Sequence, residues 1–239
     1  MRYLALVLTL AGCTGLIDGA DEPDPQPDAA TADAPPAASD AAPVAEHGPL
    51  LGSYFFTFYY VAEEQRYLDQ GLADDTAIYQ RVDGACQELT TVPLKFSDAL
   101  RIEGTGRLSD GRMVNYSASC ACPNSPCYHF LPPTHPWGSG AQSRPLVPFR
   151  SVAVDKDVVY PFGRKLYVAE LDGVMMPGDP PWGGFVHDGC VSADDTGGSI
   201  DGQHLDFFSA LRPYYLELAG ELDLVNDHVT VYDGGARCP

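Results

Sequence analysis

The stretch SADDTGGSIDGQHLDFF, residues 192–208, contains four aspartates, three glycines and one histidine. Asp206 stands between Leu205 and Phe207 at the apolar end of this stretch. Because successive side chains of a strand point to opposite faces, a strand that buries Leu205 and Phe207 places Asp206 on its other face. If that face lines a cleft, neighbouring carboxylates would raise the pKa of Asp206 toward the range of a general acid.

Other polar residues of the region have a structural interpretation beside the catalytic one. Asp155 ends the apolar run SVAVD, and Asp195 lies in a glycine-flanked turn, where an aspartate is often only a turn former. We interpret His204 as lying on the other side of the strand from Asp206, as a packed or surface histidine rather than a catalytic one. The acids lack the alternating spacing and closing glutamate of a calcium loop, so no metal is expected here.

Four motifs in a fixed order carry a family resemblance. They are AVD (153–155), DTGGSIDG (195–202), QHLD (203–206) and VTVY (229–232). This order resembles the three-aspartate, or 3D, domain of bacterial cell-wall enzymes. It is similar to the catalytic barrel of membrane-bound lytic transglycosylase A and to the stationary-phase survival and resuscitation-factor-like muralytic proteins. The resemblance covers residues 149–232.

The resemblance implies a fold and three site residues. The fold is a six-stranded double-psi β-barrel, and the three aspartates of the family fall on Asp155, Asp195 and Asp206. In the family the last of these is the catalytic acid and base, and the other two line the cleft and tune it. The earlier run FFTFYY (residues 55–60) matches the opening strand of these domains, with Thr57 at its threonine.

The glycine turn departs from the family at two positions. Asp201 stands where relatives often carry Lys or Arg, and Ser199 replaces an alanine, which makes the predicted cleft more acidic. Asp194 is interpreted as a neighbour without a catalytic role. We expect Gly197, Gly198 and Gly202 to be required for a turn with small residues and positive φ.

The resemblance also implies the chemistry, which is cleavage of the β-1,4 bond between N-acetylmuramic acid and N-acetylglucosamine in peptidoglycan. A lytic transglycosylase needs one acid and base, Asp206, and forms a 1,6-anhydro ring without water. We expect Thr57 or the amides of Gly197 and Gly198 to stabilise developing charge and bind substrate. The aromatic residues Trp137, Trp182 and Tyr128 are candidates for stacking on sugar rings or for packing.

Composition limits the other functions of the chain. It has 239 residues, 45% hydrophobic residues and a formal net charge of −19. The 14 Lys and Arg are too few and too scattered for a nucleic-acid surface, so we expect no nucleic-acid partner. We expect a monomer that binds peptidoglycan glycan strands and uses no cofactor.

Aromatic and β-branched runs separated by Gly and Pro dominate from Gly48 onward. They predict a mainly β chain: a small barrel with long loops and one or two short helices. The predicted strands are 53–62, 150–155, 165–171, 184–189, 204–208 and 228–233. The one helix indicated by its apolar spacing is 209–222, with Pro213 limiting its first turn.

Six cysteines fall in this folded region. An even number in an exported domain favours three disulfides, although their pairing stays open among 15 possibilities. The alternative is a zinc site built from CACPNSPC (residues 120–127) with His129 or His187. We expect residues 107–145 to form a long loop region held by these bridges. The cysteines are Cys86, Cys120, Cys122, Cys127, Cys190 and Cys238.

The N-terminus predicts export and anchoring. Residues 1–12 resemble a bacterial lipoprotein signal, with Cys13 as the lipidated residue, and Thr14 after it favours the outer membrane, facing the periplasm. Residues 13–47 are rich in Asp, Pro and Ala and predict a solvated tether to a domain at 48–239. The membrane is therefore contacted through the lipid only.

Two alternatives to the enzyme remain open from the sequence. The first is a non-catalytic, expansin-like glycan-binding module on the same barrel. The second is a structural lipoprotein whose barrel serves as an interaction platform, in which the acidic turns have no chemical role.

Overall fold

The computed structural model describes residues 46–71, 74–222 and 227–239. The predicted signal at residues 1–12, the lipidation at Cys13 and nearly all of the predicted tether lie outside these ranges. Among the described residues, no helix has the length and apolar character needed to cross a membrane.

The described residues are mainly β, as the sequence predicts, with three α-helices and two short 3₁₀ turns. The strands are β1 (Leu50–Glu63), β2 (Asp75–Val82), β3 (Ala85–Pro93), β4 (Thr105–Arg107), β5 (Met113–Ala118), β6 (Cys127–Phe130), β7 (Ser151–Val154), β8 (Lys165–Val168), β9 (Cys190–Asp195), β10 (His204–Leu211) and β11 (Asp227–Asp233). The helices are α1 (Glu64–Leu68), α2 (Leu94–Glu103) and α3 (Arg212–Leu222), and the 3₁₀ turns are η1 (Ala141–Ser143) and η2 (Ala169–Leu171).

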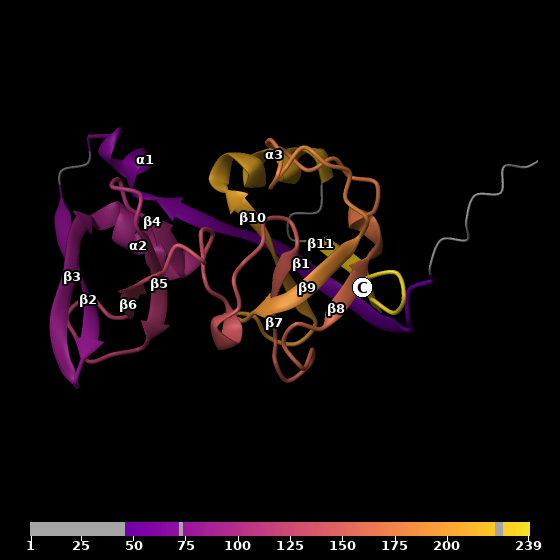
Figure 1. Ribbon diagram of the computed structural model, residues 1–239, viewed down its shortest axis with the longest axis horizontal. Helices are drawn as coiled ribbons and strands as arrows, with labels where there is room; N and C mark the ends of the chain where they lie inside the picture. Colours follow the sequence, from indigo (N-terminus) through magenta and orange to yellow (C-terminus); the bar gives the residue numbers. More distant parts are fainter. Residues whose placement is uncertain (1–45, 72–73, 223–226) are drawn as a thin grey trace, which may run out of the picture. The chain divides into compact units, whose positions relative to one another are not determined.

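Six strands form what we call the main sheet. They pair in the order β10, β7, β9, β8, β11 and β1, and β1 also pairs with β10. The pairings β1–β10 and β7–β9 are parallel, and the other four are antiparallel. The middle of β1 therefore lies beside β10 on one edge, and its first half lies beside β11 on the other (Figure 1).

The core of the main sheet follows the alternation of the strands. Phe56 of β1 and Leu205 and Phe207 of β10 have 0% exposure and belong to one apolar cluster. Each fully buried side chain of this size stabilises the fold by about 1.5–3 kcal/mol. Thr57 and Asp206, which alternate with these residues, are only partly buried. They therefore lie on the face away from that cluster.

Residues 64–130, which we call the insertion, contain β2 to β6, α1 and α2. The insertion joins the main sheet because β4 pairs with the end of β1, at Ala62 and Glu63. Its core packs Phe96 and Leu100 of α2, one turn apart, against β-strand residues. The helix ends at Gly104, whose φ of 74° and N–H bond to the Leu100 carbonyl form a left-handed cap.

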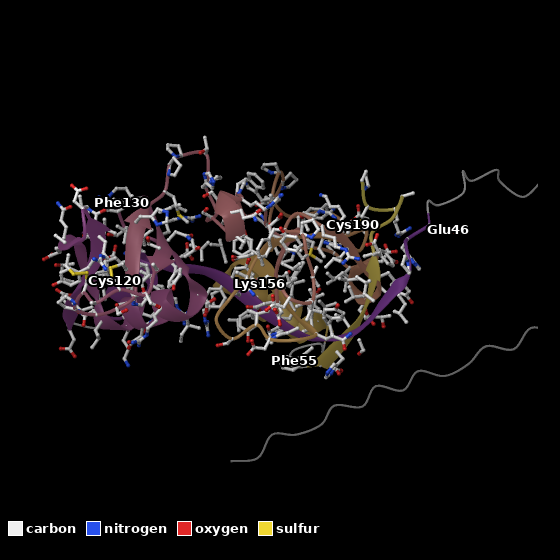
Figure 2. The ribbon with its side chains drawn as sticks, turned by 90° about the horizontal axis from the view of Figure 1, so that it is seen from below. Glu46, Phe55, Cys120, Phe130, Lys156 and Cys190 are labelled. Carbon is white, nitrogen blue, oxygen red and sulfur yellow. A yellow bond between two sulfur atoms is a disulfide. The ribbon has the colours of Figure 1, made fainter. Side chains whose placement is uncertain are left out.

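All six cysteines of the folded region are paired, which confirms three disulfides. Cys86–Cys122 and Cys120–Cys127 lie within the insertion, and Cys190–Cys238 joins the start of β9 to the C-terminal segment. Figure 2 shows Cys120 in the insertion and Cys190 among the main-sheet strands. The sulfurs of Cys120, Cys122 and Cys127 lie within 4.8 Å of one another, as in a metal cluster, but each belongs to a disulfide. The bridges therefore occupy the ligands that the zinc alternative requires.

Several local predictions are wrong. The predicted strand at 184–189 forms only one isolated bridge, between Val186 and Met175, because Gly184 and Gly189 have positive φ values of 68° and 79°. The predicted helix at 209–222 begins at Arg212 instead, since β10 continues to Leu211.

The predicted loop region at 107–145 is also wrong in part. It contains β5, β6 and η1, and β4 reaches its first residue. The hairpin of β5 and β6 is antiparallel, with Asn115 opposite His129. Two helices of the insertion, α1 and α2, have no counterpart in the prediction.

Candidate active site

Asp206 is held by Thr57 on the neighbouring strand. The parallel register of β1 and β10 pairs Thr57 with Asp206, so the two side chains meet on the same face of the sheet. The Thr57 hydroxyl donates to Asp206 Oδ1 over 2.6 Å. The structure thus brings together two of the predicted site residues, from positions 149 residues apart.

Burial gives Asp206 the properties of an acid near neutral pH. Desolvation raises its pKa to about 6, and the hydrogen bond from Thr57 acts in the opposite direction by stabilising the carboxylate. A carboxyl with this pKa exchanges a proton readily at neutral pH. It can therefore act as an acid and then as a base within one catalytic cycle.

Asp195 is the second carboxyl of the site, and Tyr59 holds it. The hydroxyl of Tyr59, two residues after Thr57 and on the same face of β1, donates to Asp195 Oδ2 over 3.2 Å. Burial raises the pKa of Asp195 to about 7, and the negative charge of Asp206 raises it further, while bonds from Thr196 N and Tyr59 oppose the shift. Thr57 and Tyr59, which alternate along β1, therefore each donate a hydrogen bond to one carboxyl of the site.

Glu103 is a third buried carboxyl, which the sequence reasoning missed. It is the last residue of α2 in the insertion, and its Oε2 accepts a hydrogen bond of 3.0 Å from the backbone N–H of Tyr60. Burial raises its pKa to about 7, and the charge of Asp206 contributes to this shift. The one sequence signal for it is a glutamate placed directly before a helix-ending glycine.

His204 lies on the same side of the sheet as Asp206, so its predicted orientation is wrong. Residues 204 and 206 are two apart on a strand, and side chains two apart share a face. His204 Nε2 lies 2.8 Å from the Thr57 hydroxyl oxygen, the same atom that contacts Asp206. The imidazole is thus in contact with the site rather than on the opposite surface.

Asp155 takes part in a different set of hydrogen bonds. Its carboxylate accepts from the backbone N–H groups of Asp157 and Gly202, both over 2.8 Å. These bonds lower its pKa and outweigh the opposing effect of desolvation. Asp155 therefore joins the turn after β7 to the turn before β10, and this position suits an anchor of the loop.

The glycine turn is built differently from the prediction. Only Gly202 has a positive φ, of 66°, so a left-handed conformation is not the reason for Gly197 and Gly198. A side chain at Gly197 would press on Ile200, at 3.0 Å, whereas Gly198 has open space. Asp201 is exposed, in agreement with its departure from the family pattern.

Asp194 is a buried structural acid. It is 7% exposed, and it accepts hydrogen bonds from the hydroxyls of Ser151, over 2.9 Å, and Ser192, over 2.8 Å. Arg144 Nη1 lies 3.6 Å from it. These contacts join β7, which Asp155 directly follows, to β9, which ends at Asp195.

The three candidate aromatic residues have different environments. Trp137 is half-buried, with the Arg107 guanidinium over its ring at 5.1 Å and the edge of Trp182 at 6.1 Å. Trp182 is 41% exposed, so this pair keeps an open ring for stacking. Tyr128 is 1% exposed in the core of the insertion, and its prediction as a sugar-stacking residue is wrong.

A cleft of about 460 Å³ lies beside the end of β1 and the start of α3. Its lining includes Tyr60, Tyr67, Arg66 and Arg212. Tyr60 belongs to this cleft through its side chain and to the carboxyl site through its backbone, which bonds to Glu103. Asp195 and Asp206 are not among the lining residues of this cleft.

Comparison with solved structures concerns the fold alone. The chain resembles in fold the crystal structure of Escherichia coli MltA with bound chitohexaose, at 16% identity and a TM-score of 0.50, over 76% of this chain and 71% of that one. A membrane-bound lytic murein transglycosylase from Agrobacterium tumefaciens aligns at 16% identity and a TM-score of 0.43, over 76% and 73% of the two chains. LtgG of Burkholderia pseudomallei, a lytic transglycosylase, aligns at 18% identity and a TM-score of 0.39, over 77% and 73%.

No curated protein matches the chain by sequence. A protein-family model does match it, and the matched residues contain β7 to β10, α3 and nearly all of β11, with both coupled aspartates. Residues 150–232 of this chain match the family model of the 3D domain.

Proposed function

We propose that this protein is a lytic transglycosylase that cleaves the β-1,4 bond between N-acetylmuramic acid and N-acetylglucosamine in peptidoglycan. One observation carries the proposal: Asp206, within the residues that match the 3D family model, is a partly buried carboxyl whose desolvation raises its pKa to about 6, and Thr57 holds it. The fold of MltA, whose crystal structure contains chitohexaose, supports a glycan as the substrate class. The acidity of the chain suits an uncharged sugar backbone better than a polyanion.

The proposed reaction uses Asp206 twice. The protonated carboxyl gives its proton to the glycosidic oxygen, which leaves with the bonding electron pair on the N-acetylglucosamine side as the bond to the muramic C1 breaks. The C6 hydroxyl of the muramic residue then bonds to C1, and its proton passes to the Asp206 carboxylate. The protonated enzyme is restored, water is not consumed, and the product is a 1,6-anhydro sugar.

The neighbouring groups assist this cycle without taking the proton. Thr57 stabilises the carboxylate that forms after the first step, because its hydroxyl donates to Oδ1. Asp195 lies in the same site and is also partly protonated near neutral pH. In its ionised form its negative charge would stabilise the positive charge that develops on the sugar ring in the transition state. Trp137, beside the exposed Trp182, offers an aromatic face for a sugar ring.

We propose further that the main sheet is the six-stranded double-psi barrel of this family. The six pairings that begin and end at β1 support this assignment. We also propose a monomeric domain at residues 48–239, tethered by residues 13–47 to a lipid on Cys13, in the cell envelope at the outer membrane. The tether sequence and the small residues before Cys13 support this arrangement.

Isolated peptidoglycan sacculi provide the test. The purified protein should release soluble muropeptides with anhydro-muramic ends, which mass spectrometry identifies. Asp206→Asn should lower the rate by at least about a hundredfold, the usual worth of a general acid. Asp83→Asn is the matched control, since it removes an exposed acid from the β2–β3 turn of the insertion.

Other products would support other functions. Reducing ends in place of anhydro ends would indicate a hydrolase. Binding to sacculi without any release would support the non-catalytic glycan-binding module. Undiminished release by Asp206→Asn would contradict the role of Asp206.

A further inference from the structure

The Thr57 hydroxyl lies between two side chains of β10. Its oxygen is 2.6 Å from Asp206 Oδ1 and 2.8 Å from His204 Nε2. The strand register explains this position, since Phe55 pairs with His204 and Thr57 pairs with Asp206. His204 and Asp206 share a face of β10, so both reach the same hydroxyl.

The direction of these two hydrogen bonds follows from the number of protons. A threonine hydroxyl has one proton, and the Asp206 carboxylate has none. Thr57 therefore donates its proton to Asp206 and must accept a proton from His204 Nε2–H. Hydrogen bonds in such a chain polarise one another, so the bond to the carboxylate is stronger when the hydroxyl oxygen also accepts.

We propose that His204 is a positioning residue that acts on Asp206 through the Thr57 hydroxyl. The proposal rests on the proposed function, in which Asp206 is the acid and base. By occupying the lone pair of Thr57, His204 fixes the hydroxyl rotor toward Oδ1 of Asp206. In the protonated form of Asp206, the acidic proton then lies on Oδ2, the oxygen that faces the substrate. After this proton is transferred, the hydrogen bond from Thr57 keeps the Asp206 carboxylate oriented for its role as base.

Two neighbours of the imidazole favour its doubly protonated form, in which Nδ1–H faces the Ser199 carbonyl and Nε2–H donates to Thr57. Burial lowers the pKa of His204, and the Ser199 carbonyl and the charge of Asp201 oppose this shift. On β10 the nearest acid is Asp206 itself, across Thr57. On β7, Asp155 follows Val154, which pairs with Leu205. On β11, His228 contacts the same Phe55 ring as His204, with ring centroids at 5.8 and 5.0 Å.

A double-mutant cycle tests whether His204 acts through Thr57. The rate of anhydro-muropeptide release is measured for His204→Leu, for Thr57→Val and for the pair together. Each single change should lower kcat by about tenfold, the usual effect of losing one supporting hydrogen bond, with little change in KM. The double variant should be no slower than Thr57→Val alone, because Thr57→Val already removes the hydroxyl through which His204 acts on Asp206. We call this connection from His204 through Thr57 to Asp206 the relay. Multiplying losses would overturn the proposal.

Two further variants separate the relay from packing. His204→Gln keeps an N–H donor at the end of the side chain and should retain most of the kcat that His204→Leu loses. His228→Leu removes the other imidazole that contacts Phe55 and should leave kcat unchanged. If His204→Gln and His204→Leu have equally low kcat values, the N–H donor is not responsible for the loss, and the proposed action of His204 through Thr57 is wrong.

A titration without any substrate keeps this test independent of the proposed function. The Asp206 carboxyl carbon is followed by NMR against pH in the wild type, His204→Leu and His204→Gln. Loss of the oriented donor should raise the pKa of Asp206 in His204→Leu and not in His204→Gln. An unchanged pKa in His204→Leu overturns the relay. If the wild type releases no muropeptides, the proposed function fails while the titration still decides on the relay.

Discussion

At the scale of single residues, the site depends on two hydroxyls of β1 that serve different carboxyls. Thr57 donates to Asp206 and Tyr59 donates to Asp195. Tyr59 itself is 7% exposed, and burial raises its pKa well above its usual value, so it stays protonated and remains a donor. The charge of Asp206 also contributes to the raised pKa values of Asp195 and Glu103.

This electrostatic interaction predicts how removal of the Asp206 carboxyl changes the pKa values of the other two. Asp206→Asn takes away the negative charge near both partners, so the pKa values of Asp195 and Glu103 should fall from about 7. NMR titration of the side-chain carboxyl carbons measures both shifts. Asp201→Asn, in the exposed turn, should move neither value. Unchanged titration in Asp206→Asn would show that the three carboxyls do not share one electrostatic environment.

Single residues also show what the sequence can predict about the site. Asp195, Asp206 and Thr57 were predicted because motif order identifies them, and the structure brings Asp206 to Thr57. Glu103 was missed because its position depends on the contact between the insertion and β1, which no local pattern encodes. The side of His204 was assigned wrongly although the two-residue period of a strand determines it.

At the scale of elements, predictions succeeded where apolar residues are dense. The five predicted strands that exist contain core residues of the main sheet, such as Phe56, Val152 and Leu166. The hairpin of β2 and β3 was missed because most of its side chains are polar or exposed. α2 was missed because only Phe96 and Leu100 of its ten residues are buried, and Pro93 offers no side-chain cap.

The end of α2 gives a test of an element boundary. Gly104 has a φ of 74° and open space where a β-carbon would lie, so Gly104→Ala should destabilise the fold by about 1 kcal/mol through backbone strain alone. Gly220 of α3 also has open space and lacks a positive φ. Gly220→Ala should therefore stabilise by about 0.4–1 kcal/mol. Urea unfolding measures both, and equal signs would contradict the role of Gly104 as a cap.

At the scale of the whole molecule, the fold collects groups that are far apart in the chain. β1, β9 and β10 supply Thr57, Asp195 and Asp206, and the insertion supplies Glu103.

The same assembly buries a histidine away from the site. His187 is 0% exposed, its Nδ1 accepts from the Gly189 N–H over 2.9 Å, and its Nε2–H donates to the Phe149 carbonyl over 2.7 Å. Burial, and next the charge of Arg150, lower its pKa to about 4.

These opposite shifts make the stability of the molecule depend on pH in two directions. His187 has a folded pKa of about 4, below its ordinary 6.5, so its contribution is complete above pH 6.5 and is lost as the pH falls toward 4. The partly buried carboxyls have raised pKa values, of about 7 for Asp195 against an ordinary 3.8, so their contribution is complete below pH 3.8 and is lost as the pH rises through 7. The two windows overlap, so between pH 4 and 6.5 the two contributions to the free energy of unfolding change in opposite directions.

Two variants separate these two contributions. His187→Gln retains a donor and an acceptor without titrating, so relative to the wild type its free energy of unfolding should lack a rise of about 3 kcal/mol between pH 4 and 6.5, since each pKa unit is worth about 1.4 kcal/mol. Asp195→Asn should instead lack a fall in the free energy of unfolding between pH 3.8 and 7. Urea unfolding at intervals of pH measures both, with the exposed His228→Gln as the control. A pH dependence in His187→Gln equal to that of the wild type would contradict the role of His187.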